Sequence, residues 1–481
     1  MFYHSTRSEN FRADSAQAVL EGLAPDGGLY MPEALPAFDW KACLEGSSMD
    51  MSTKILSALL PDIPDMPQLV KNAYTGKFET EDLTPTVSVG DFGVLELFRG
   101  PTSAFKDVAL SMLPQLLTAA KTVKGQEKDI LILTATSGDT GKAALEGFHD
   151  VPGIKICVFY PHGGVSQVQR AQMVTQEGSN VAVCAVYGNF DDAQTGVKNI
   201  FAACRDKEMK VALSSANSIN IGRLAPQIMY YFRSYRDLLD AGKITLGEEV
   251  NFSVPTGNFG DILAGYLAKQ LGLPVGKLIC ASNANNVLTD FIRTGTYDRQ
   301  RPLLKTTSPS MDILVSSNLE RLLYLLSGDT ALVAELMGKL NKEGSYTVPA
   351  DLLEKIQAEF TAYYCDDARA DEIMGRVWNT HHYLCDPHTA SGWAAAEDYI
   401  AETGDNRAMV VLSTASPYKF PVAVLTAIGG DTSGTEFEQM ARLSALTSVP
   451  VPRNLSGLEG KEEKHTGVIE KDAMLEYVLS L

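Results

Sequence analysis

The sequence lacks the features that would direct it to a membrane or to a nucleic acid. No apolar run approaches the length that spans a bilayer, and the first residues show no basic-then-apolar signal pattern. Basic residues are also too few to attract these partners, since 41 Lys and Arg against 59 Asp and Glu give a net charge of −18. Such a charge repels nucleic acid and anionic lipid. We therefore expect a cytoplasmic protein without a nucleic-acid or membrane partner.

Paired metal ligands are missing as well. The seven cysteines are odd in number and form no Cys-x-x-Cys pair, which disfavours both a zinc cluster and a disulfide framework. The histidines show no metal-ligand spacing on one predicted helix, because the adjacent His381 and His382 cannot face one ion. We expect no metal site.

The chain has the length and composition of a folded protein with two or three domains. Apolar β-rich runs recur, each followed by a helical pattern, which predicts βαβ units and an α/β fold with parallel sheets. The predicted strands cover residues 129–134, 154–160, 180–186, 250–255, 277–281 and 408–413. We expect a small N-terminal domain of short helices and loops (1–90), a small α/β domain (91–230) and a large α/β domain (231–481) with a helical insertion near 315–380.

In open parallel sheets, ligands bind outside the carboxyl ends of strands, so the loops that lead into helices are the candidate sites. The first such loop, residues 96–107, leads into an apolar-periodic helix with Lys106 near its start. A lysine becomes nucleophilic when burial or nearby positive charge lowers its pKa, and a helix N-terminus in an apolar pocket supplies both influences. Lys106 is thus a candidate Schiff-base lysine, although a single lysine is more often a solvated surface residue.

A second candidate turn follows the strand 129–134. It consists of Ser137, Gly138, Asp139 and Thr140. Hydroxyls and backbone N–H groups converge at such a turn, as in a carboxylate or phosphate cradle, but the same residues also make a good helix N-cap. The spacing of Gly138 and Gly141 does not fit a nucleoside-triphosphate loop, which leaves that ligand a weak alternative.

Two further loops follow strands in the second half of the chain. One consists of Thr256, Gly257, Asn258, Phe259, Gly260 and Asp261. Its glycines permit close backbone approach to an anion, and the first N–H groups of the next helix can donate to it, so it is the better phosphate site. The other contains Thr414, whose hydroxyl can hydrogen-bond a neutral pyridine nitrogen. Each alone is also compatible with an ordinary turn.

Together, the motifs resemble the threonine synthase family, whose members are fold type II pyridoxal-phosphate (PLP) enzymes. The resemblance covers nearly the whole chain. It includes Gly-Leu-Ala-Pro-Asp-Gly-Gly-Leu-Tyr at 22–30, Ala-Phe-Lys-Asp at 104–107, Ala-Thr-Ser-Gly-Asp-Thr-Gly at 135–141, Gly-Asn-Phe-Gly-Asp at 257–261, Ser-Pro at 308–309 with Met-Asp at 311–312, and Asp-Pro-His-Thr-Ala at 386–390.

This resemblance implies that PLP is the cofactor and that Lys106 is its Schiff-base lysine. It also implies that loop 256–261 holds the cofactor phosphate, that Thr414 faces the pyridine nitrogen and that the turn 137–140 receives the substrate carboxylate. Arginine suits forked contacts with phosphate. The candidate ligands of the substrate phosphate are Asn217, Ser218 and Arg223.

The implied reaction converts O-phospho-L-homoserine and water into L-threonine and phosphate by γ-elimination and β-addition of water, with Lys106 also acting as the general base. The partner is thus a small-molecule substrate, and the chain is expected to be a monomer or a homodimer. One alternative is a phospholyase or dehydratase that acts on a related hydroxyamino acid. Another is a PLP-binding regulatory protein without turnover, which the intact Lys106 and complete loops disfavour.

Four residues depart from the family pattern. Ser416 and Tyr418 stand where the family commonly has His and Ala, and Arg99 and Ser103 stand where it often has His and Leu. We expect these departures to alter secondary contacts of the pocket more than the cofactor loops.

Overall fold

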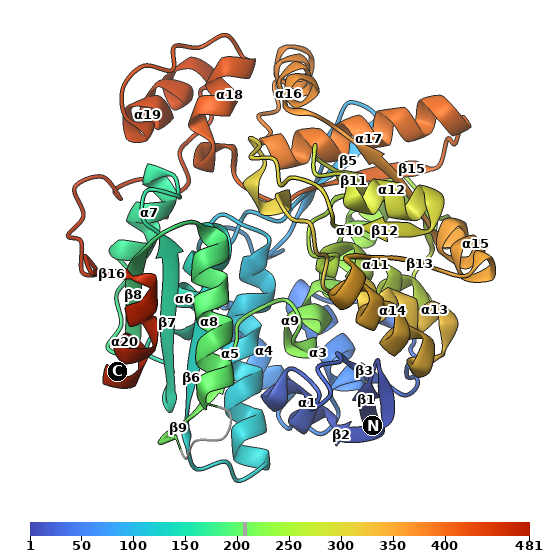
Figure 1. Cartoon of the computed structure of the whole chain (residues 1–481). Coiled ribbons are helices and arrows are strands. Elements are labelled where there is room, and N and C mark those ends of the chain that lie inside the picture. Colours follow the sequence, from blue (N-terminus) through green and yellow to red (C-terminus); the bar gives the residue numbers. More distant parts are fainter. Residues whose placement is uncertain (205–208) are drawn as a thin grey trace.

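The computed structural model describes residues 1–204 and 209–481, and it contains two parallel-stranded sheets flanked by helices (Figure 1). The predicted α/β class is confirmed. All six predicted strands are present, with bounds that differ from the prediction by at most two residues. No helix among the described residues is both long and apolar enough to cross a bilayer.

The smaller sheet has five strands, all paired in parallel. Their order is β16 (Val468–Glu470), β8 (Val181–Tyr187), β7 (Ile154–Pro161), β6 (Asp129–Ala135) and β9 (Val211–Ser214). Alternate residues of β6 and β7 belong to different apolar clusters: Ile130 and Ile156 pack with α5 (Lys106–Val123) and α6 (Asp139–Phe148), whereas Leu131 and Cys157 pack with α8 (Phe190–Cys204) and α20 (Met474–Ser480). Helices therefore cover both faces of this sheet.

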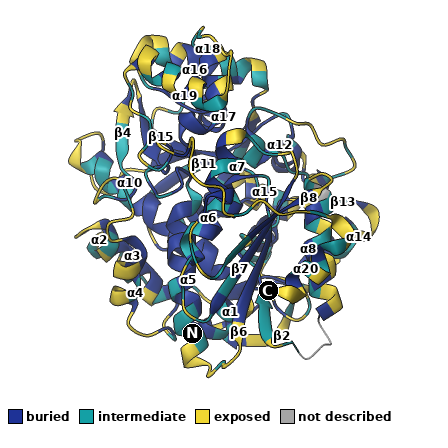
Figure 2. Ribbon diagram, turned by 90° about the vertical axis from the view of Figure 1, so that its left-hand side faces the viewer, coloured by how far each residue is buried: buried dark blue, intermediate teal, exposed yellow. Residues whose placement is uncertain are grey.

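The larger sheet has six strands, parallel except at one edge. Their order is β14 (Phe360–Tyr364), β11 (Val275–Ser282), β10 (Val250–Pro255), β15 (Ala408–Ser413), β5 (Phe92–Glu96) and β4 (Thr86–Val89). One face packs on α10 (Ile228–Asp240) and α11 (Gly260–Gln270), and the other on α16 (Asp367–His381) and α17 (Pro387–Thr403). Figure 2 shows the inner strands mainly as buried, whereas the edge strand β4 and the outer helix faces are intermediate or exposed.

The two sheets do not follow the expected domain boundaries. Strands β4 and β5, from either side of the boundary at 90, both pair into the larger sheet, while β16 from the end of the chain pairs with β8. All five residues of β5 are buried, which suits a strand inside a sheet covered on both faces. The division of the chain into domains at residues 90 and 230 stays a prediction, and each of the two sheets contains strands from more than one of these expected domains.

The N-terminal segment contains a sheet where only helices and loops are expected from the sequence. Strands β1 (Phe2–Ser5), β2 (Ser8–Asp14) and β3 (Tyr30–Pro32) pair antiparallel, and the helices that follow are α1 (Ser15–Glu21), α2 (Trp40–Cys43), α3 (Ser48–Leu59) and α4 (Met66–Tyr74). Most of β2 is exposed, so its sequence carries no apolar alternation.

The remaining helices and strands connect or follow the elements already named. They are α7 (Gln167–Val174), α9 (Ile221–Leu224), α12 (Val287–Thr294), β12 (Thr296–Asp298), α13 (Leu319–Ser327), α14 (Thr330–Glu343), β13 (Ser345–Thr347), α15 (Ala350–Glu359), α18 (Pro421–Ala427) and α19 (Glu436–Thr447). The region 315–380 is mainly helical, as expected. It also supplies the edge strand β14, which the sequence analysis did not identify.

Candidate active site

Lys106 lies where the chain passes from the larger sheet to the smaller one. It is the first residue of α5, and the residues before it run beside the loop that follows β15. Ala104 forms an antiparallel bridge with Ala415, and the N–H of Phe105 donates to the carbonyl oxygen of Thr414 at 2.8 Å. The structure therefore places Lys106 and Thr414, both predicted site residues, on neighbouring stretches of backbone.

The turn before Lys106 is held by a buried carboxylate. Asp107 accepts hydrogen bonds from the N–H and the hydroxyl of Thr102, the former at 2.8 Å. A Cβ at Gly100 would lie 2.5 Å from the side chain of Asp107, so glycine is required for this close approach. Burial raises the pKa of Asp107 to about 6, although the bonds from Thr102 oppose the shift. The turn thus fixes the start of α5.

The amine of Lys106 has few hydrogen-bond partners among the described residues. Its Nζ is 3.5 Å from the hydroxyl of Ser310 and 4.7 Å from the ring centroid of Phe105. Burial lowers the pKa of Lys106 to about 8; the charge of Asp139 opposes this shift, and that of Lys419 adds to it. A considerable share of the amine is then neutral near pH 8, as a nucleophile and general base require.

Asp139, the first residue of α6, is paired with a lysine that the sequence analysis did not assign. Its Oδ1 lies 2.5 Å from Nζ of Lys419 and accepts from Gln169 Nε2 at 2.9 Å, and both charged side chains are almost completely buried. Burial raises the pKa of Asp139, but Lys419 and Lys106 together hold it below its usual range. Because this carboxylate is already neutralised, a substrate carboxylate at turn 137–140 would use hydroxyls and the N–H groups that begin α6.

Loop 256–261 forms a tight backbone turn at the start of α11. A Cβ at Gly257 would lie 2.8 Å from the carbonyl oxygen of Ser310, and Phe259 has a positive φ of 63°. The carbonyl oxygen of Asn258 accepts from the N–H and the side chain of Asn318 at 3.1 and 3.2 Å. Burial raises the pKa of Asp261 to about 7, which limits its negative charge beside an anion. The first N–H groups of α11 can then receive a phosphate.

Replacement of Gly257 by alanine is expected to weaken cofactor binding. The new Cβ would meet the backbone of Ser310 rather than a movable side chain, so the loop has to shift away from its phosphate-binding shape. We expect the dissociation constant for PLP to rise on the order of tenfold to a hundredfold, the cost of about one or two charge-assisted hydrogen bonds. Fluorescence titration with PLP measures it. Gly338→Ala is the matched control because a Cβ there meets open space, and an unchanged PLP affinity in Gly257→Ala would contradict the assignment.

The candidates for the substrate phosphate differ in their surroundings. Arg223 in α9 is 3% exposed, and its Nε has no hydrogen-bond partner among the described residues, although another guanidinium nitrogen donates to the carbonyl oxygen of Ala216. Burial lowers the pKa of Arg223 to about 10. Ser218 binds Asn318 through its carbonyl oxygen at 3.2 Å, and Asn217 is exposed. Arg223 is the candidate with an unsatisfied buried donor.

Ser310 and Lys419 are missed by sequence reasoning. Ser310 lies between two motif pairs and gives no signal of its own, because a serine in a Pro-containing loop is ordinary turn chemistry. Lys419 does give a signal, since a lysine in the apolar stretch Tyr-Lys-Phe-Pro after a buried strand requires a buried partner.

The departures from the family pattern point away from Lys106. Arg99 forms ion pairs with Glu79 and Glu96, Ser103 donates to Asn454 at 2.9 Å, and the hydroxyl of Tyr418 donates to the carbonyl oxygen of Val449. Ser416 accepts from the N–H of Tyr418 at 3.3 Å. These side chains bind surrounding segments, mainly those near residues 79 and 449–454.

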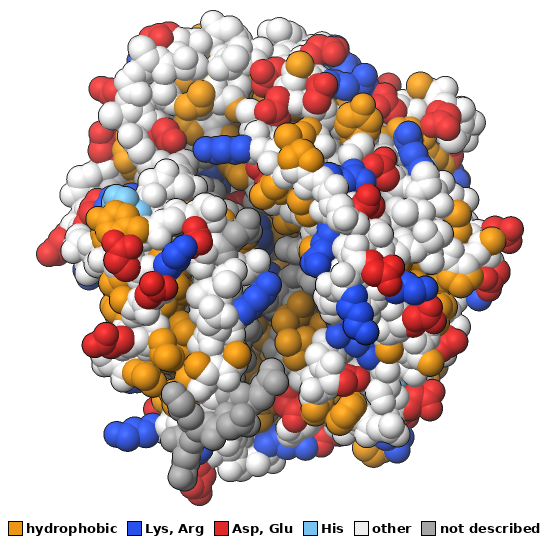
Figure 3. Space-filling model, viewed as in Figure 1, with side chains coloured by type: hydrophobic (Ala, Val, Ile, Leu, Met, Phe, Trp, Pro, Cys, Tyr) orange, Lys and Arg blue, Asp and Glu red, His pale blue; other side chains and the backbone are white. Residues whose placement is uncertain are grey.

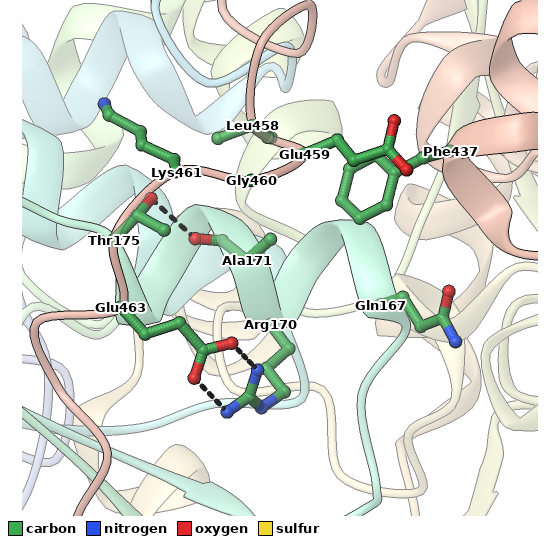
Figure 4. Close-up of a pocket in the computed structure, with 10 residues that line it drawn as sticks. All are labelled: Gln167, Arg170, Ala171, Thr175, Phe437, Leu458, Glu459, Gly460, Lys461 and Glu463. Carbon is green, nitrogen blue, oxygen red and sulfur yellow. Dashed lines mark hydrogen bonds and ion pairs between the residues drawn. The ribbon is translucent and has the colours of Figure 1, made fainter.

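Two hollows are seen on the molecule. Figure 3 shows one between the halves that carry the two sheets, with Lys and Arg side chains at its margins. Figure 4 shows a separate cavity of about 400 Å³ between α7 and residues 458–463, where Arg170 is already paired with Glu463. None of the predicted site residues lines the second cavity.

Comparisons with known proteins agree along the chain. A family model described as pyridoxal-phosphate dependent enzyme matches residues 81–414, and models for the threonine synthase N terminus and C-terminal region match residues 2–74 and 389–478. The threonine synthase of Saccharomyces cerevisiae is 38% identical over 465 residues, covering 89% of each chain.

A human relative, threonine synthase-like 1, is 37% identical over 90% of this chain, which spans only 61% of the relative's length. Among solved structures, the PLP-bound threonine synthase from Brucella melitensis has a TM-score of 0.88 at 37% identity, and the match covers 100% of this chain and 99% of that one.

Proposed function

The chain belongs to the threonine synthase family of pyridoxal-phosphate-dependent enzymes, and from that premise we propose that it converts O-phospho-L-homoserine and water into L-threonine and inorganic phosphate. The observation that carries the proposal is the position of Lys106. Lys106 begins α5 directly after Phe105, whose N–H donates to Thr414. Its amine, with a pKa lowered to about 8, lies 3.5 Å from the hydroxyl of Ser310, whose backbone packs on Gly257.

The residues present fit PLP. Gly257 leaves room that a Cβ would fill, the start of α11 offers N–H groups to a phosphate, and Lys106 supplies an amine of lowered pKa. Thr414 supplies a hydroxyl that can hydrogen-bond a neutral pyridine nitrogen. We propose that these residues hold the cofactor, with Lys106 as its covalent attachment.

The chain's own groups then have distinct tasks. PLP, when bound, would supply an electron sink for the negative charge that develops at Cα and Cβ of the amino substrate. Nζ of Lys106, partly neutral near pH 8, accepts the proton from the substrate Cα and serves for proton transfer at Cβ. The turn 137–140 orients the substrate carboxylate, and Arg223 holds the γ-phosphate until its C–O bond breaks. The two protons removed from Cα and Cβ return to Cγ, which becomes the methyl group, and to Cα. Water supplies the hydroxyl at Cβ, and its remaining proton leaves with the phosphate.

The activity is tested by product analysis. Purified protein with PLP and O-phospho-L-homoserine is expected to release threonine and phosphate in equal amounts. Phosphate released together with an oxoacid and ammonia would contradict the proposal and favour a phospholyase. We further propose that the protein is cytoplasmic and that it is a monomer or a homodimer. Gel filtration with light scattering measures the oligomeric state.

Arg223→Gln is expected to raise KM for O-phospho-L-homoserine by about 10- to 100-fold, the effect of losing one charge-assisted hydrogen bond of about 1.5–3 kcal/mol. The variant removes a buried charge that lacks a full set of partners, so folding and PLP affinity should be kept. Steady-state kinetics measures KM. The control is Arg12→Gln, an exposed arginine paired with Glu33, and an unchanged KM in Arg223→Gln would contradict the assignment.

A further inference from the structure

Ser310 is the point at which the separate loops of the site meet. It lies in a 3₁₀ turn, Pro309–Met311, on the segment between β12 and α13. Its hydroxyl is 3.5 Å from Nζ of Lys106 and 3.4 Å from Oδ2 of Asp139. Its carbonyl oxygen is the atom that a Cβ at Gly257 would meet. One residue therefore contacts the lysine, the buried carboxylate and the phosphate loop.

The backbone of Ser310 is held by a buried histidine. The N–H of Ser310 donates to Nε2 of His388 at 3.2 Å, while Nδ1 of the same ring lies 2.6 Å from Oδ2 of Asp386. Because Nδ1–H donates to the carboxylate, Nε2 is left as the acceptor that the N–H requires. This pair is fully buried, so the turn has one preferred position.

The loop around Ser310 is braced by a second carboxylate. Asp312 accepts from Asn283 at 2.8 Å, from Asn285 at 3.0 Å, and from the N–H of Thr306 at 3.0 Å. A long connection with one 3₁₀ turn as its regular structure would otherwise be free to vary in conformation. The hydrogen bonds to Asp312 instead hold the connection in place. They fix the backbone that positions the hydroxyl of Ser310 near the amine of Lys106.

The direction of the hydrogen bonds gives Ser310 a defined effect on the amine. Nζ–H of Lys106 donates to Oγ of Ser310, and the hydroxyl in turn donates to the carboxylate of Asp139. The charged groups that act on the amine are Asp139 of α6, Lys419 of the turn after β15, Arg223 of α9 and Asp261 of α11. Asp139 favours the protonated amine through its charge, and Ser310 joins the amine to this carboxylate by hydrogen bonds that limit the orientation of the amine.

We propose that Ser310 is a positioning residue for Lys106, whose hydroxyl links the amine to the Asp139–Lys419 pair and so sets the orientation and proton affinity of the lysine. This inference rests on the proposed function in that Lys106 is taken as the cofactor lysine. It assigns a role to a residue that no motif identifies, and it explains why a neutralised carboxylate is buried near a reactive amine.

The test compares Ser310→Ala, Ser310→Thr and a hydroxyl deletion elsewhere in the same loop, Thr307→Val. Thr307 donates to Asp367 at 3.0 Å, away from Lys106. The visible band of the lysine-bound cofactor is titrated with pH in each purified holoenzyme, without substrate. In Ser310→Ala its midpoint is expected to move to lower pH, because the protonated lysine nitrogen loses an acceptor. Ser310→Thr is expected to restore the wild-type midpoint.

Kinetics gives the second readout. Ser310→Ala is expected to lower kcat on the order of tenfold with little change in KM, less than the 10²–10⁴-fold that a general base itself contributes. The proposal is overturned if Ser310→Ala keeps the wild-type midpoint, if Ser310→Thr behaves as Ser310→Ala, or if Thr307→Val shifts the midpoint equally. The titration uses no substrate, so a wild-type enzyme that failed to make threonine would overturn the proposed function and leave this test valid.

Discussion

Lys106→Ala is expected to abolish turnover, with a loss on the order of 10⁴-fold or more in kcat, because the variant lacks both the covalent attachment of the cofactor and the general base. Its purified form should also lack the visible band of a lysine-bound cofactor. The two effects arise from one amine, whose pKa of about 8 leaves it partly neutral at neutral pH. Absorbance spectra with and without PLP, alongside phosphate release, measure both.

A second lysine in a motif provides the control for this result. Lys142 follows the Ser-Gly-Asp-Thr-Gly turn, but its Nζ binds Glu146 at 3.0 Å and the side chain of Gln176. Lys142→Ala should therefore keep the visible band and most of the turnover. A Lys106→Ala protein that kept the band would place the attachment on another residue and remove the basis of the proposed mechanism.

Lys419→Met is expected to destabilise the fold by about 3–5 kcal/mol, because it leaves the buried carboxylate of Asp139 without its counter-charge. Methionine and lysine side chains are similar in length, so the packing around position 419 stays nearly constant. Urea unfolding followed by fluorescence measures the change. Lys339→Met, which removes an exposed ion pair with Glu335, should leave the unfolding curve unchanged.

The double variant Lys419→Met with Asp139→Asn separates charge from packing. Removing both charges should recover most of the lost stability, since a neutral pair carries no uncompensated ion. The effect also has a defined pH dependence. The folded-state pKa of Asp139 lies below its unfolded value near 3.9, so the stability from this pair is present above that pH and is lost as the pH falls further. Non-recovery in the double variant would show that Lys419 acts by packing alone.

The sequence predicts the buried strands well because strands covered on both faces are continuous apolar runs. β6, β7 and β10 are of this kind, and each lies within one residue of its predicted range. The exposed strand β2 and the three-residue β16 carry too few apolar residues for such a signal. Which sheet a strand joins depends on contacts between distant segments, so the pairing of β5 with β15 could not be predicted.

The residues of the candidate site also differ in how well the sequence predicts them. Lys106 lies near the start of a predicted helix and loop 256–261 follows a predicted strand, and the order of the motifs identifies both. The partners that tune the amine come from far along the chain: Ser310 is 204 residues from Lys106, and Lys419 is a contact of Asp139 that no local pattern indicates. A lysine in an apolar stretch of sequence does indicate that a buried partner is required, but the sequence does not show which carboxylate is that partner.

The backbone bridge between Ala104 and Ala415 has a mechanical consequence for the reaction cycle. Through it, and through the bonds of Phe105 to Thr414 and of Ser416 to Ser103, the peptide that carries Lys106 is fastened to the β15 loop although α5 covers the smaller sheet. A rotation of the smaller sheet as a rigid layer would thus carry the turn at Asp139 toward or away from the amine while the distance from Lys106 to the β15 loop stayed constant. The Lys419–Asp139 ion pair joins the β15 loop to the start of α6, the two parts that such a rotation would move relative to each other.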